Sequence, residues 1–210
     1  MTTIPPRMIL AFDTSSAACT VALFDDSGTI VASRDDVIGR GHAEQLVPMI
    51  REVMDGRRAD GILVGVGPGS FTGIRVAIAA AHGLAIGWKA ELKGMSSLSL
   101  IATGIYGSGE MAVAIVGGHG ELVVQQFGGF GIEAVDEFAS LAPADAAART
   151  AAQLIVGSGA RQLVEARGWG EAREAFPTAS NALKMPKPMR SLPPRPVYAR
   201  APDARVPEAA

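Results

Sequence analysis

A glycine-rich segment between an apolar run and a long apolar helix pattern constrains this chain most. Residues 65–75 read Gly-Val-Gly-Pro-Gly-Ser-Phe-Thr-Gly-Ile-Arg, after the apolar run 62–64 and before an alanine-rich pattern that extends to about Ile86. Glycines permit sharp turns and the close approach of other groups, and Ser70 and Thr72 are residue types that cap helices. The sequence therefore predicts a strand, a glycine loop and the N-terminus of a helix.

The chemistry of this loop has two interpretations. Backbone N–H groups at a helix start can receive an anion, so the loop is consistent with a nucleotide-type fold. It is not a Walker loop, because no Gly-Lys-Ser/Thr ends it, and its glycine spacing differs from the dinucleotide fingerprint. A tight turn packed against a neighbouring backbone explains the same glycines, and from the loop alone we prefer that interpretation.

Composition sets further bounds. The chain has 210 residues, of which 48% are hydrophobic and 19% charged, and a net charge of −2. This balance gives a sizeable core and no general electrostatic attraction to nucleic acid. The single cysteine, Cys19, excludes an internal disulfide and is expected to be a small buried side chain. Without a secretory signal, and with the run 9–12 too short to span a membrane, we expect a cytoplasmic protein with no membrane partner.

The first half of the chain predicts a meander followed by alternating helices and strands. Apolar runs at 8–12, 19–24 and 29–33, with the turn signal Asp-Asp-Ser-Gly after the second, predict three antiparallel strands. Residues 42–54 place apolar residues on one helical face, although Pro48 would kink that helix or shift its start. The later elements are a strand at 62–66, a helix at 74–86, a short strand at 92–95 and a helix at 98–106 capped by Ser96 or Ser97.

The second half begins at a glycine-rich boundary at 106–109. A β-hairpin is predicted from strands 111–116 and 121–127, and loop and helix from residues 130–152. Residues 154–159 repeat the strand and glycine loop in miniature, a helix is predicted at 160–166, and the chain is proline-rich from 186. The pattern predicts two α/β lobes with mixed sheets: residues 1–106, a smaller lobe 107–187, and a tail 188–210 that docks back on the first lobe.

Four segments, in order along the chain, carry a resemblance to a known family. They are 9–15 (Ile-Leu-Ala-Phe-Asp-Thr-Ser), 42–50 (His-Ala-Glu-Gln-Leu-Val-Pro-Met-Ile), 67–75 (Gly-Pro-Gly-Ser-Phe-Thr-Gly-Ile-Arg) and 196–204 (Pro-Val-Tyr-Ala-Arg-Ala-Pro-Asp-Ala). Together they resemble the TsaB family, also called YeaZ, the glycoprotease-like proteins of bacterial tRNA threonylcarbamoyladenosine synthesis. The matches span nearly the whole chain, and the glycine loop is the most specific of them.

The resemblance implies a fold and a role. The fold is the actin-like, sugar-kinase-like ATPase fold, related to ribonuclease H, with a reduced second lobe. The role is that of a non-catalytic partner of TsaD, the sister protein that carries the chemistry. With TsaD and the ATPase TsaE, the family helps to place a threonylcarbamoyl group on adenosine 37 of tRNAs reading codons that begin with A. Two alternatives remain: an independent ATP-dependent transferase or glycoprotease, and a self-associating nucleotide-binding protein.

No catalytic or metal-binding residue is predicted. The sister enzyme carries a His-x-x-x-His metal motif, and the resemblance places its two positions on Met95 and Ser99 here, neither of which is a usual ligand for a divalent cation. The three histidines, at 42, 82 and 119, contain no pair with i, i+4 spacing. These residues argue against a metal centre of the sister's kind.

A nucleotide site is the main cofactor hypothesis. Asp13 ends the first strand, where actin-like folds place a metal- or phosphate-facing acid, and Thr14 and Ser15 could donate to a phosphate. With Gly67 and Gly69 they form the predicted cofactor-binding set, for ATP or ADP bound weakly or supplied through partners. The alternative is an Asx or Ser/Thr turn that joins two strands.

The partner surface is expected on the two first-lobe helices, which in the family form a bundle with TsaD or with a second copy. The candidate interface residues are His42, Leu46, Met49, Ile50, Val53, Ile74, Ala77, Ile78 and Ala81. The alternative is that both stripes are ordinary core. On the interface hypothesis, Ile78→Glu breaks partner binding and leaves the fold intact.

Two further segments remain open. Many family members carry Asp-Ala-Arg at the second-lobe hairpin, where this chain reads Val116-Gly117-Gly118, which puts any ligand or tRNA contact of that turn in doubt. Four arginines in the tail, at 190, 195, 200 and 205, either touch tRNA or belong to a solvated tail held on the first lobe through Tyr198.

Overall fold

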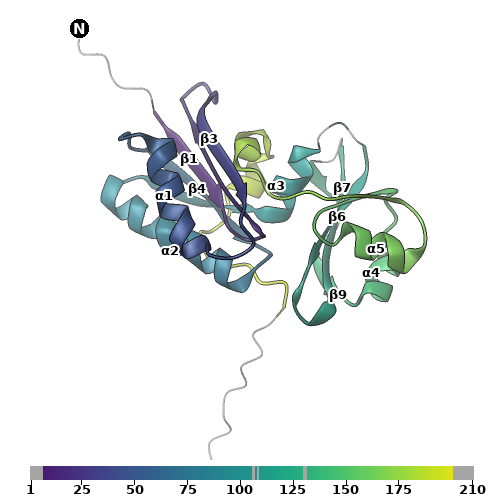
Figure 1. Cartoon of the computed structure of the whole chain (residues 1–210). Helices are drawn as coiled ribbons and strands as arrows, with labels where there is room; N and C mark the ends of the chain where they lie inside the picture. Colours follow the sequence, from purple (N-terminus) through teal and green to yellow (C-terminus); the bar gives the residue numbers. More distant parts are fainter. Residues whose placement is uncertain (1–6, 106, 108, 130–131, 201–210) are drawn as a thin grey trace, which may run out of the picture.

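The computed structural model describes residues 7–105, 107, 109–129 and 132–200. Figure 1 shows two α/β lobes side by side, joined by α3 and by the C-terminal segment that returns from the second lobe to the first. Predicted positions at 1–6, Tyr106, Ser108, Phe130 and 201–210, including Arg205, lie outside the described residues.

The first lobe is built on a five-stranded mixed sheet with the order β3-β2-β1-β4-β5. β1, β2 and β3 form the predicted antiparallel meander, and β4 and β5 run parallel to β1. The strands are β1 (Ile9–Asp13), β2 (Ala18–Phe24), β3 (Ile30–Val37), β4 (Gly61–Gly67) and β5 (Glu91–Ser96).

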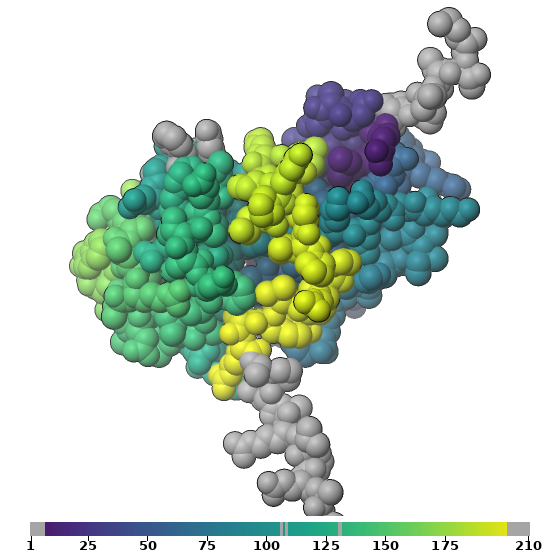
Figure 2. Space-filling view, turned by 180° about the vertical axis from the view of Figure 1, so that it is seen from behind, coloured from purple at the N-terminus to yellow at the C-terminus, as the bar shows by residue number. Residues whose placement is uncertain are grey.

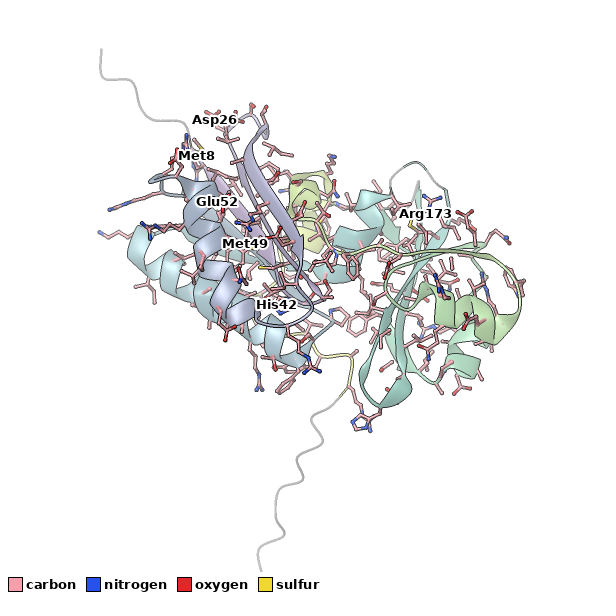
Figure 3. All side chains as sticks on the ribbon, in the orientation of Figure 1. Met8, Asp26, His42, Met49, Glu52 and Arg173 are labelled. Carbon is pink, nitrogen blue, oxygen red and sulfur yellow. The ribbon has the colours of Figure 1, made fainter. Side chains whose placement is uncertain are left out.

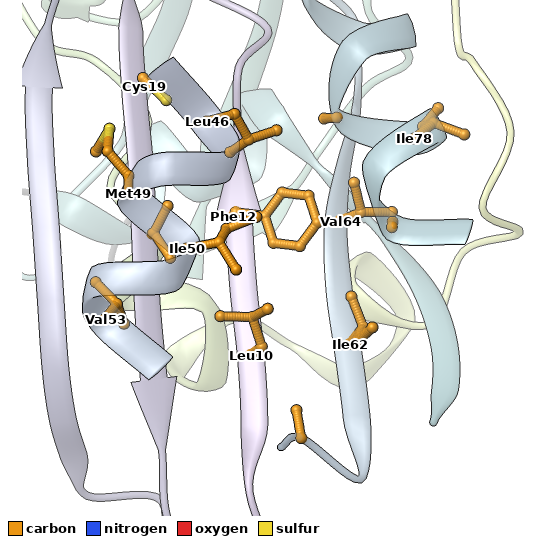
Figure 4. Packing of buried hydrophobic residues seen from close by; sticks show 14 of the residues in the cluster. Leu10, Phe12, Cys19, Leu46, Met49, Ile50, Val53, Ile62, Val64 and Ile78 are labelled. Carbon is orange, nitrogen blue, oxygen red and sulfur yellow. The ribbon is translucent and has the colours of Figure 1, made fainter. Parts of the chain in front are cut away.

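Helices cover both faces of this sheet. α1 (His42–Met54), which contains Pro48, and α2 (Phe71–Trp88) pack on one face, against alternate residues of the central strands such as Leu10 and Phe12 (Figure 4). The residues between them, such as Ala11, face α3 (Ser97–Gly104) and the short 3-10 helix η3 (Ala179–Lys184). The period of two along the strands produces this double-sided core.

The second lobe is smaller. Its sheet has the order β11-β10-β6-β7-β8, with β9 also paired to β7. The elements are β6 (Met111–Val116), the turn η1 (Gly118–Gly120), β7 (Leu122–Gly128), β8 (Glu133–Ala134), β9 (Ala139–Leu141), α4 (Pro143–Arg149), β10 (Leu154–Val156), α5 (Ala160–Arg167) and β11 (Glu171–Arg173). The predicted hairpin is β6–β7 and is antiparallel.

The second lobe repeats the topology of the first. β6 pairs antiparallel with β7 and parallel with β10, as β1 does with β2 and β4, and β11 extends β10 as β5 extends β4. α4 precedes β10 and α5 follows it, as α1 and α2 flank β4. The arrangement is the actin-like, sugar-kinase-like fold with a reduced second lobe, so the predicted fold class is confirmed.

The chain returns to the first lobe earlier than the predicted boundary at 187. Ala179 donates its backbone N–H to Thr20 Oγ1 at 2.6 Å, and Ala182 and Met185 are buried in the first-lobe core. The alanines of η3 pack on the sheet face that α1 and α2 leave open. The predicted second lobe, residues 107–187, wrongly included this segment.

Beyond η3 the chain crosses the back of the molecule as a surface strap, which we define as residues 179–200 (Figure 2). It contains the short 3-10 helix η4 (Lys187–Arg190). Leu192 forms an isolated antiparallel bridge with Gly94, and Val197 donates its N–H to Val66 O at 2.8 Å. The strap therefore runs over β5 and the end of β4.

α2 is long and apolar enough to span a membrane by length and composition alone, with a mean hydropathy of 1.3. Only 28% of its residues are buried in the structure. One side of the helix nevertheless packs on β4, and its first turn is hydrogen-bonded to Ser15 and Thr14. These contacts show that α2 packs on the sheet of an α/β lobe, and that an apolar part of its outer side is exposed.

Candidate functional site: the cleft between the lobes

A cavity of about 740 Å³ lies between the two lobes. The first lobe contributes the turn after β1, the loop before α1 and the first turns of α1 and α2. The second lobe contributes Ile115 and Val116 at the end of β6, Ser158 in the loop after β10, and Phe176. The residues predicted to bind a cofactor lie at the floor of this cleft or beneath it.

Asp13 is fully buried, and both of its carboxylate oxygens accept hydrogen bonds. Ser15 donates its backbone N–H to Oδ1 at 2.6 Å, and the Ser97 hydroxyl donates to Oδ2 at 2.6 Å. Gly67 in turn donates its N–H to Ser97 Oγ at 3.2 Å. Burial raises the pKa of Asp13 above its ordinary value, while the hydrogen bonds from Ser97 and Ser15 oppose this rise. The carboxylate thus ties β1, α3 and the glycine loop together.

The glycine loop packs directly against the turn that follows Asp13. A Cβ on Gly65 would lie closer than 3.0 Å to the Asp13 side chain, and a Cβ on Gly69 or Gly73 would approach the backbone of the turn equally closely. Ser70 donates its N–H to Ser15 O at 2.6 Å. These glycines are therefore required for the close approach of the chain's own backbone.

The start of α2 is fixed by the same contact. Ser70 caps the helix, because its hydroxyl accepts from the N–H of Gly73 at 3.2 Å. The Thr14 hydroxyl donates to Gly73 O at 2.7 Å. The predicted capping role of Ser70 is confirmed, and Thr72 instead faces the cleft.

The structure brings the predicted cofactor-binding residues together, and of these five Ser15 and Gly69 border the cleft. Asp13, Thr14 and Ser15 are buried, and their polar atoms described above bond to the chain itself. A Cβ on Gly67 would meet Ile74 and the carbonyl of Val197, so the strap closes that side of the loop. The buried Asp13 carboxylate and Thr14 hydroxyl therefore do not fit direct ligands of a nucleotide phosphate or its metal ion, and their Asx/Ser-Thr turn is a structural joint. Binding of ATP or ADP by this chain stays a prediction.

Five further polar residues border the cleft outside the predicted cofactor-binding set. They are Ser16, Arg40, Glu44, Thr72 and Ser158. Arg40 stands between Gly39 and Gly41, both with positive φ. The Gly-Arg-Gly pattern could have indicated Arg40, because glycines on both sides of a single cation are typical of a loop in which that side chain is exposed.

His42 begins α1 at the end that faces the second lobe (Figure 3). Its Nε2 atom is buried and has no hydrogen-bond partner among the described residues. Its charge lowers the pKa of Asp13, as a smaller cause than burial and the serine hydrogen bonds. Of the predicted interface residues it is the only one at the cleft.

The remaining predicted interface residues belong to the core of the first lobe. Each is at most 8% exposed: Leu46, Met49, Ile50, Val53, Ile74, Ala77, Ile78 and Ala81. They face the sheet and one another, so these side chains are not available to a partner (Figure 4). The apolar stripe marked the inner face of each helix, and a glutamate at 78 would be placed in the core, which makes Ile78→Glu unsuitable as an interface test.

The outer face of the same helix pair is apolar in part. Val47 on α1 is 60% exposed and Ile86 on α2 is 80% exposed. Alanines and glycines accompany them on the exposed sides: Ala43, Ala79, Gly83 and Gly87. We call these six residues the outer helix face.

The positions that correspond to the sister enzyme's metal motif do not fit a metal. Met95 is buried in the core, and Ser99 is buried in α3 with its hydroxyl unpartnered in the described part of the chain. Within the described ranges, no three His, Cys, Asp or Glu side chains gather where they could hold an ion. Cys19 is buried as expected, and burial raises its thiol pKa to about 11.

The tail contacts the first lobe through Tyr198. Its ring stacks on Phe71 with a centroid distance of 5.0 Å, and Arg75 Nε donates to its hydroxyl at 2.9 Å. Arg200 lies 3.5 Å from a Glu121 carboxylate oxygen. At the second-lobe hairpin, Val116 is exposed beside the cleft and the two glycines form a turn.

Comparison with known proteins gives the family. The family model described as tRNA N6-adenosine threonylcarbamoyltransferase, TsaD, matches residues 31–189. The chain is 37% identical over 103 residues to the tRNA threonylcarbamoyladenosine biosynthesis protein TsaB of Escherichia coli (strain K12), covering 47% of this chain and 44% of that protein. For TsaB of Haemophilus influenzae the identity is 36% over 100 residues, 45% of this chain and 41% of that protein. The matches span less than half the length of these curated relatives.

Solved structures extend the similarity to nearly the whole chain. A Pseudomonas aeruginosa protein described as uncharacterized, with similarity to the peptidase YeaZ, has a TM-score of 0.77 and 30% identity, over 92% of this chain and 100% of that chain. YeaZ from Pseudomonas aeruginosa has a TM-score of 0.77 and 28% identity, over 91% of this chain and 99% of that chain. Since the resembling motifs, the two-lobed fold and these matches agree, the chain belongs to the TsaB (YeaZ) family.

Proposed function

We propose that this chain is a non-catalytic subunit of the machinery that forms N6-threonylcarbamoyladenosine at position 37 of tRNAs reading codons that begin with A. Its partner in this proposal is TsaD, with TsaE and the tRNA joining through the complex in the cytoplasm. Family membership supports the pathway, since relatives in the family are named as biosynthesis proteins of this modification.

The outer helix face carries the proposal. Isolated exposed apolar residues are ordinary on a protein surface, but a helix that is apolar on all sides is normally covered. α2 is apolar over most of its circumference, with Arg75 and His82 on the side that meets the strap, and most of it is not buried by its own chain. Glycine and alanine at its exposed positions permit close approach by another helix. We therefore assign the partner surface to Val47, Ile86 and the small residues around them.

The non-catalytic role is supported by the residues at the glycine loop. Asp13 is buried and its hydrogen-bonding capacity serves the fold. A catalytic acid or metal ligand must reach its substrate or ion. Met95 and Ser99 offer no ligand set in place of the sister enzyme's histidines.

The test is size-exclusion chromatography with light scattering, on this chain alone and mixed with TsaD of its own organism. We expect a one-to-one complex that replaces any homodimer. The variant Val47→Glu/Ile86→Glu places charges on the outer helix face and is expected to weaken the complex at least 100-fold, since each desolvated carboxylate costs several kcal/mol. Both positions are exposed, so the fold should survive.

The matched control is Val37→Glu. Val37 is a similarly exposed apolar residue, at 65%, at the end of the edge strand β3 of the same lobe. It should bind TsaD as the unaltered chain does. A folded Val47→Glu/Ile86→Glu variant with full TsaD affinity would refute the assigned surface, and the absence of any complex at micromolar concentrations would refute the scaffold role.

The cleft favours nucleotide binding as a second candidate function. Its volume is within the range of small-molecule sites, and it is bordered by Arg40 and by the first turns of α1 and α2, whose helix dipoles favour an anion. Titration of the isolated chain with ATP and ADP by calorimetry tests it. Binding that is lost in Arg40→Gln would support this function, and no heat at millimolar nucleotide would reject it.

A further inference from the structure

The strap has a charge pattern unlike the rest of the chain. It holds five basic residues and no aspartate or glutamate, whereas the whole chain has 19 basic and 21 acidic residues. The five are Lys184, Lys187, Arg190, Arg195 and Arg200. A net charge of −2 therefore conceals a concentrated positive segment on one surface.

This segment is held in place along the back of the molecule (Figure 2). Leu192 exchanges two backbone hydrogen bonds with Gly94, at 2.7 and 3.0 Å, and Val197 bonds to Val66. The His82 ring lies 3.3 Å from Pro194 O. The backbone between the cations is thus ordered before any ligand arrives, which lowers the entropic cost of binding through them.

Two of the strap cations are exposed without a counter-ion. Lys187 and Arg195 have no ion pair or side-chain hydrogen bond within the described ranges. The other three each have a contact: Lys184 donates to Asn181 Oδ1, Arg190 to Met185 O, and Arg200 lies near Glu121. Lys187 and Arg195 are therefore the most available to an anionic partner.

The first-lobe edge beside Lys187 adds charges of both signs. A cavity of about 420 Å³ there is bordered by Arg7, Lys93, Lys187 and Arg190, and by Asp26, Asp60 and Glu91. The four cations outnumber the three carboxylates, and one charge of each sign is paired, since Glu91 lies 2.8 Å from Lys93. The balance at this edge stays positive.

The far end of the strap presents an aromatic and guanidinium stack. The Arg75 guanidinium carbon lies 3.6 Å from the centre of the Phe71 ring, and Phe71 is 45% exposed. Tyr198 of the strap stacks on the same ring. Stacked aromatic and arginine planes beside a cationic track are typical of surfaces that bind nucleic acid, because bases stack on them.

From this combination we infer that the strap is an RNA-binding surface, in which Lys187 and Arg195 contact phosphates and the Phe71–Arg75–Tyr198 stack lies at one end. The inference rests on the proposed function, which supplies tRNA as the RNA. It makes this chain a direct contributor to tRNA affinity. The stack and the extended, ordered track favour RNA over an anionic lipid surface, which basic amphipathic helices usually recognise.

The test measures tRNA affinity of the complex with TsaD by fluorescence anisotropy, with a labelled transcript that carries adenosine 37. The variant is Lys187→Gln/Arg195→Gln, in which both changes are on exposed side chains. Loss of two phosphate contacts should weaken binding about 25- to 60-fold at about 0.1 M salt and reduce the slope of log K against log salt by about 1.4–1.8.

The control of equal charge change is Arg161→Gln/Arg173→Gln, which removes two exposed charges from α5 and β11 of the second lobe. Figure 3 labels Arg173. The control variant should lower the affinity less than twofold. Equal affinity and salt slope for the strap variant and the unaltered complex would overturn the inference. So would strap-dependent binding to phosphatidylglycerol vesicles with unchanged tRNA affinity, which would assign the strap to lipid.

Failure of the proposed function is recognised separately. If light scattering shows no complex with TsaD, the same titration is made with the chain alone. Strap-dependent affinity for the transcript then supports the RNA surface without the scaffold role, and no affinity for RNA rejects both.

Discussion

The same substitution at two positions of α2 should change stability in opposite directions. Gly73 lies in the first turn of the helix and Gly83 in its middle. A Cβ at Gly73 would lie closer than 3.0 Å to the carbonyl oxygen of Thr14, whereas a Cβ at Gly83 has nothing within 4 Å. Gly73→Ala is therefore expected to destabilise the chain and Gly83→Ala to stabilise it.

The magnitudes follow from these contacts. Alanine in an exposed helix interior is better than glycine by about 0.5–1 kcal/mol, which is the expected gain at Gly83. At Gly73 the backbone must move apart, at a cost of about 1–3 kcal/mol for overpacking. The movement also breaks the bond from the Thr14 hydroxyl to Gly73 O, worth about 1 kcal/mol. We expect a net loss of about 3 kcal/mol for Gly73→Ala.

The assay is thermal and urea unfolding of the isolated chain, at one concentration and with the oligomeric state checked by light scattering. For a chain of this length, 1 kcal/mol shifts Tm by about 2–4 °C. Gly73→Ala should lower Tm by about 6–12 °C and Gly83→Ala raise it by about 1–4 °C. Equal shifts of the same sign would show that the close contact between the glycine loop and the turn after β1 is not what Gly73 serves.

Four further predictions concern the hydrogen bonds of Asp13, Thr20 and Tyr198. Asp13→Ala should cost about 2–4 kcal/mol in urea unfolding, because the Ser15 N–H and the Ser97 hydroxyl lose their acceptor. Since burial raises the pKa of Asp13, its contribution to stability is fully present below the ordinary value of 3.8 and is lost as pH rises. The free energy of unfolding of Asp13→Asn, measured relative to that of the unaltered chain, should accordingly rise between pH 4 and pH 7. A relative free energy that does not change with pH would contradict the raised pKa. Thr20→Val should cost about 1–3 kcal/mol and speed hydrogen exchange of the Ala179 amide, which loses its acceptor. Tyr198→Phe keeps the stack, removes the acceptor of Arg75, and should cost no more than about 1 kcal/mol in thermal unfolding.

Much of the fold was readable from local patterns. The meander, α1, the strand and helix around the glycine loop, and the second-lobe hairpin lie where their apolar runs and turn signals predicted them. These elements have clear periods of two or about 3.6 residues, which bury one face of each. The return of the chain to the first lobe at Ala179 could not be predicted from local patterns. The helix η3 is short, and its contact with Thr20 joins residues that are 159 positions apart.

The site was harder to predict, since sequence shows which residues are apolar or polar but not which side they face. The stripe from Leu46 to Val53 and its counterpart on α2 were correct as helical faces, but the structure assigns them to the core. The broad apolar girth of α2 indicated a surface left for a partner, but not which residues form it. The interpretation of the glycine loop as a packed turn agrees with the contacts of Gly69 and Gly73 with the turn after β1. The sequence alone does not show that this turn is their neighbour.

The repeated topology of the lobes bears on whether the cleft can perform chemistry. β1 pairs with β4 in the register that β6 keeps with β10, so the position of Asp13 in the first lobe corresponds to Ala114 in the second. Gly65 and Gly157 occupy equivalent positions opposite them, and a Cβ would meet the Asp13 carboxylate in one case and the Ala114 carbonyl in the other. A metal-bound nucleotide held between the lobes would be ligated mainly by oxygen atoms, carboxylates above all. The first lobe buries its carboxylate in a structural joint and the second has a methyl group in its place, so neither loop presents a carboxylate to the cleft at this position.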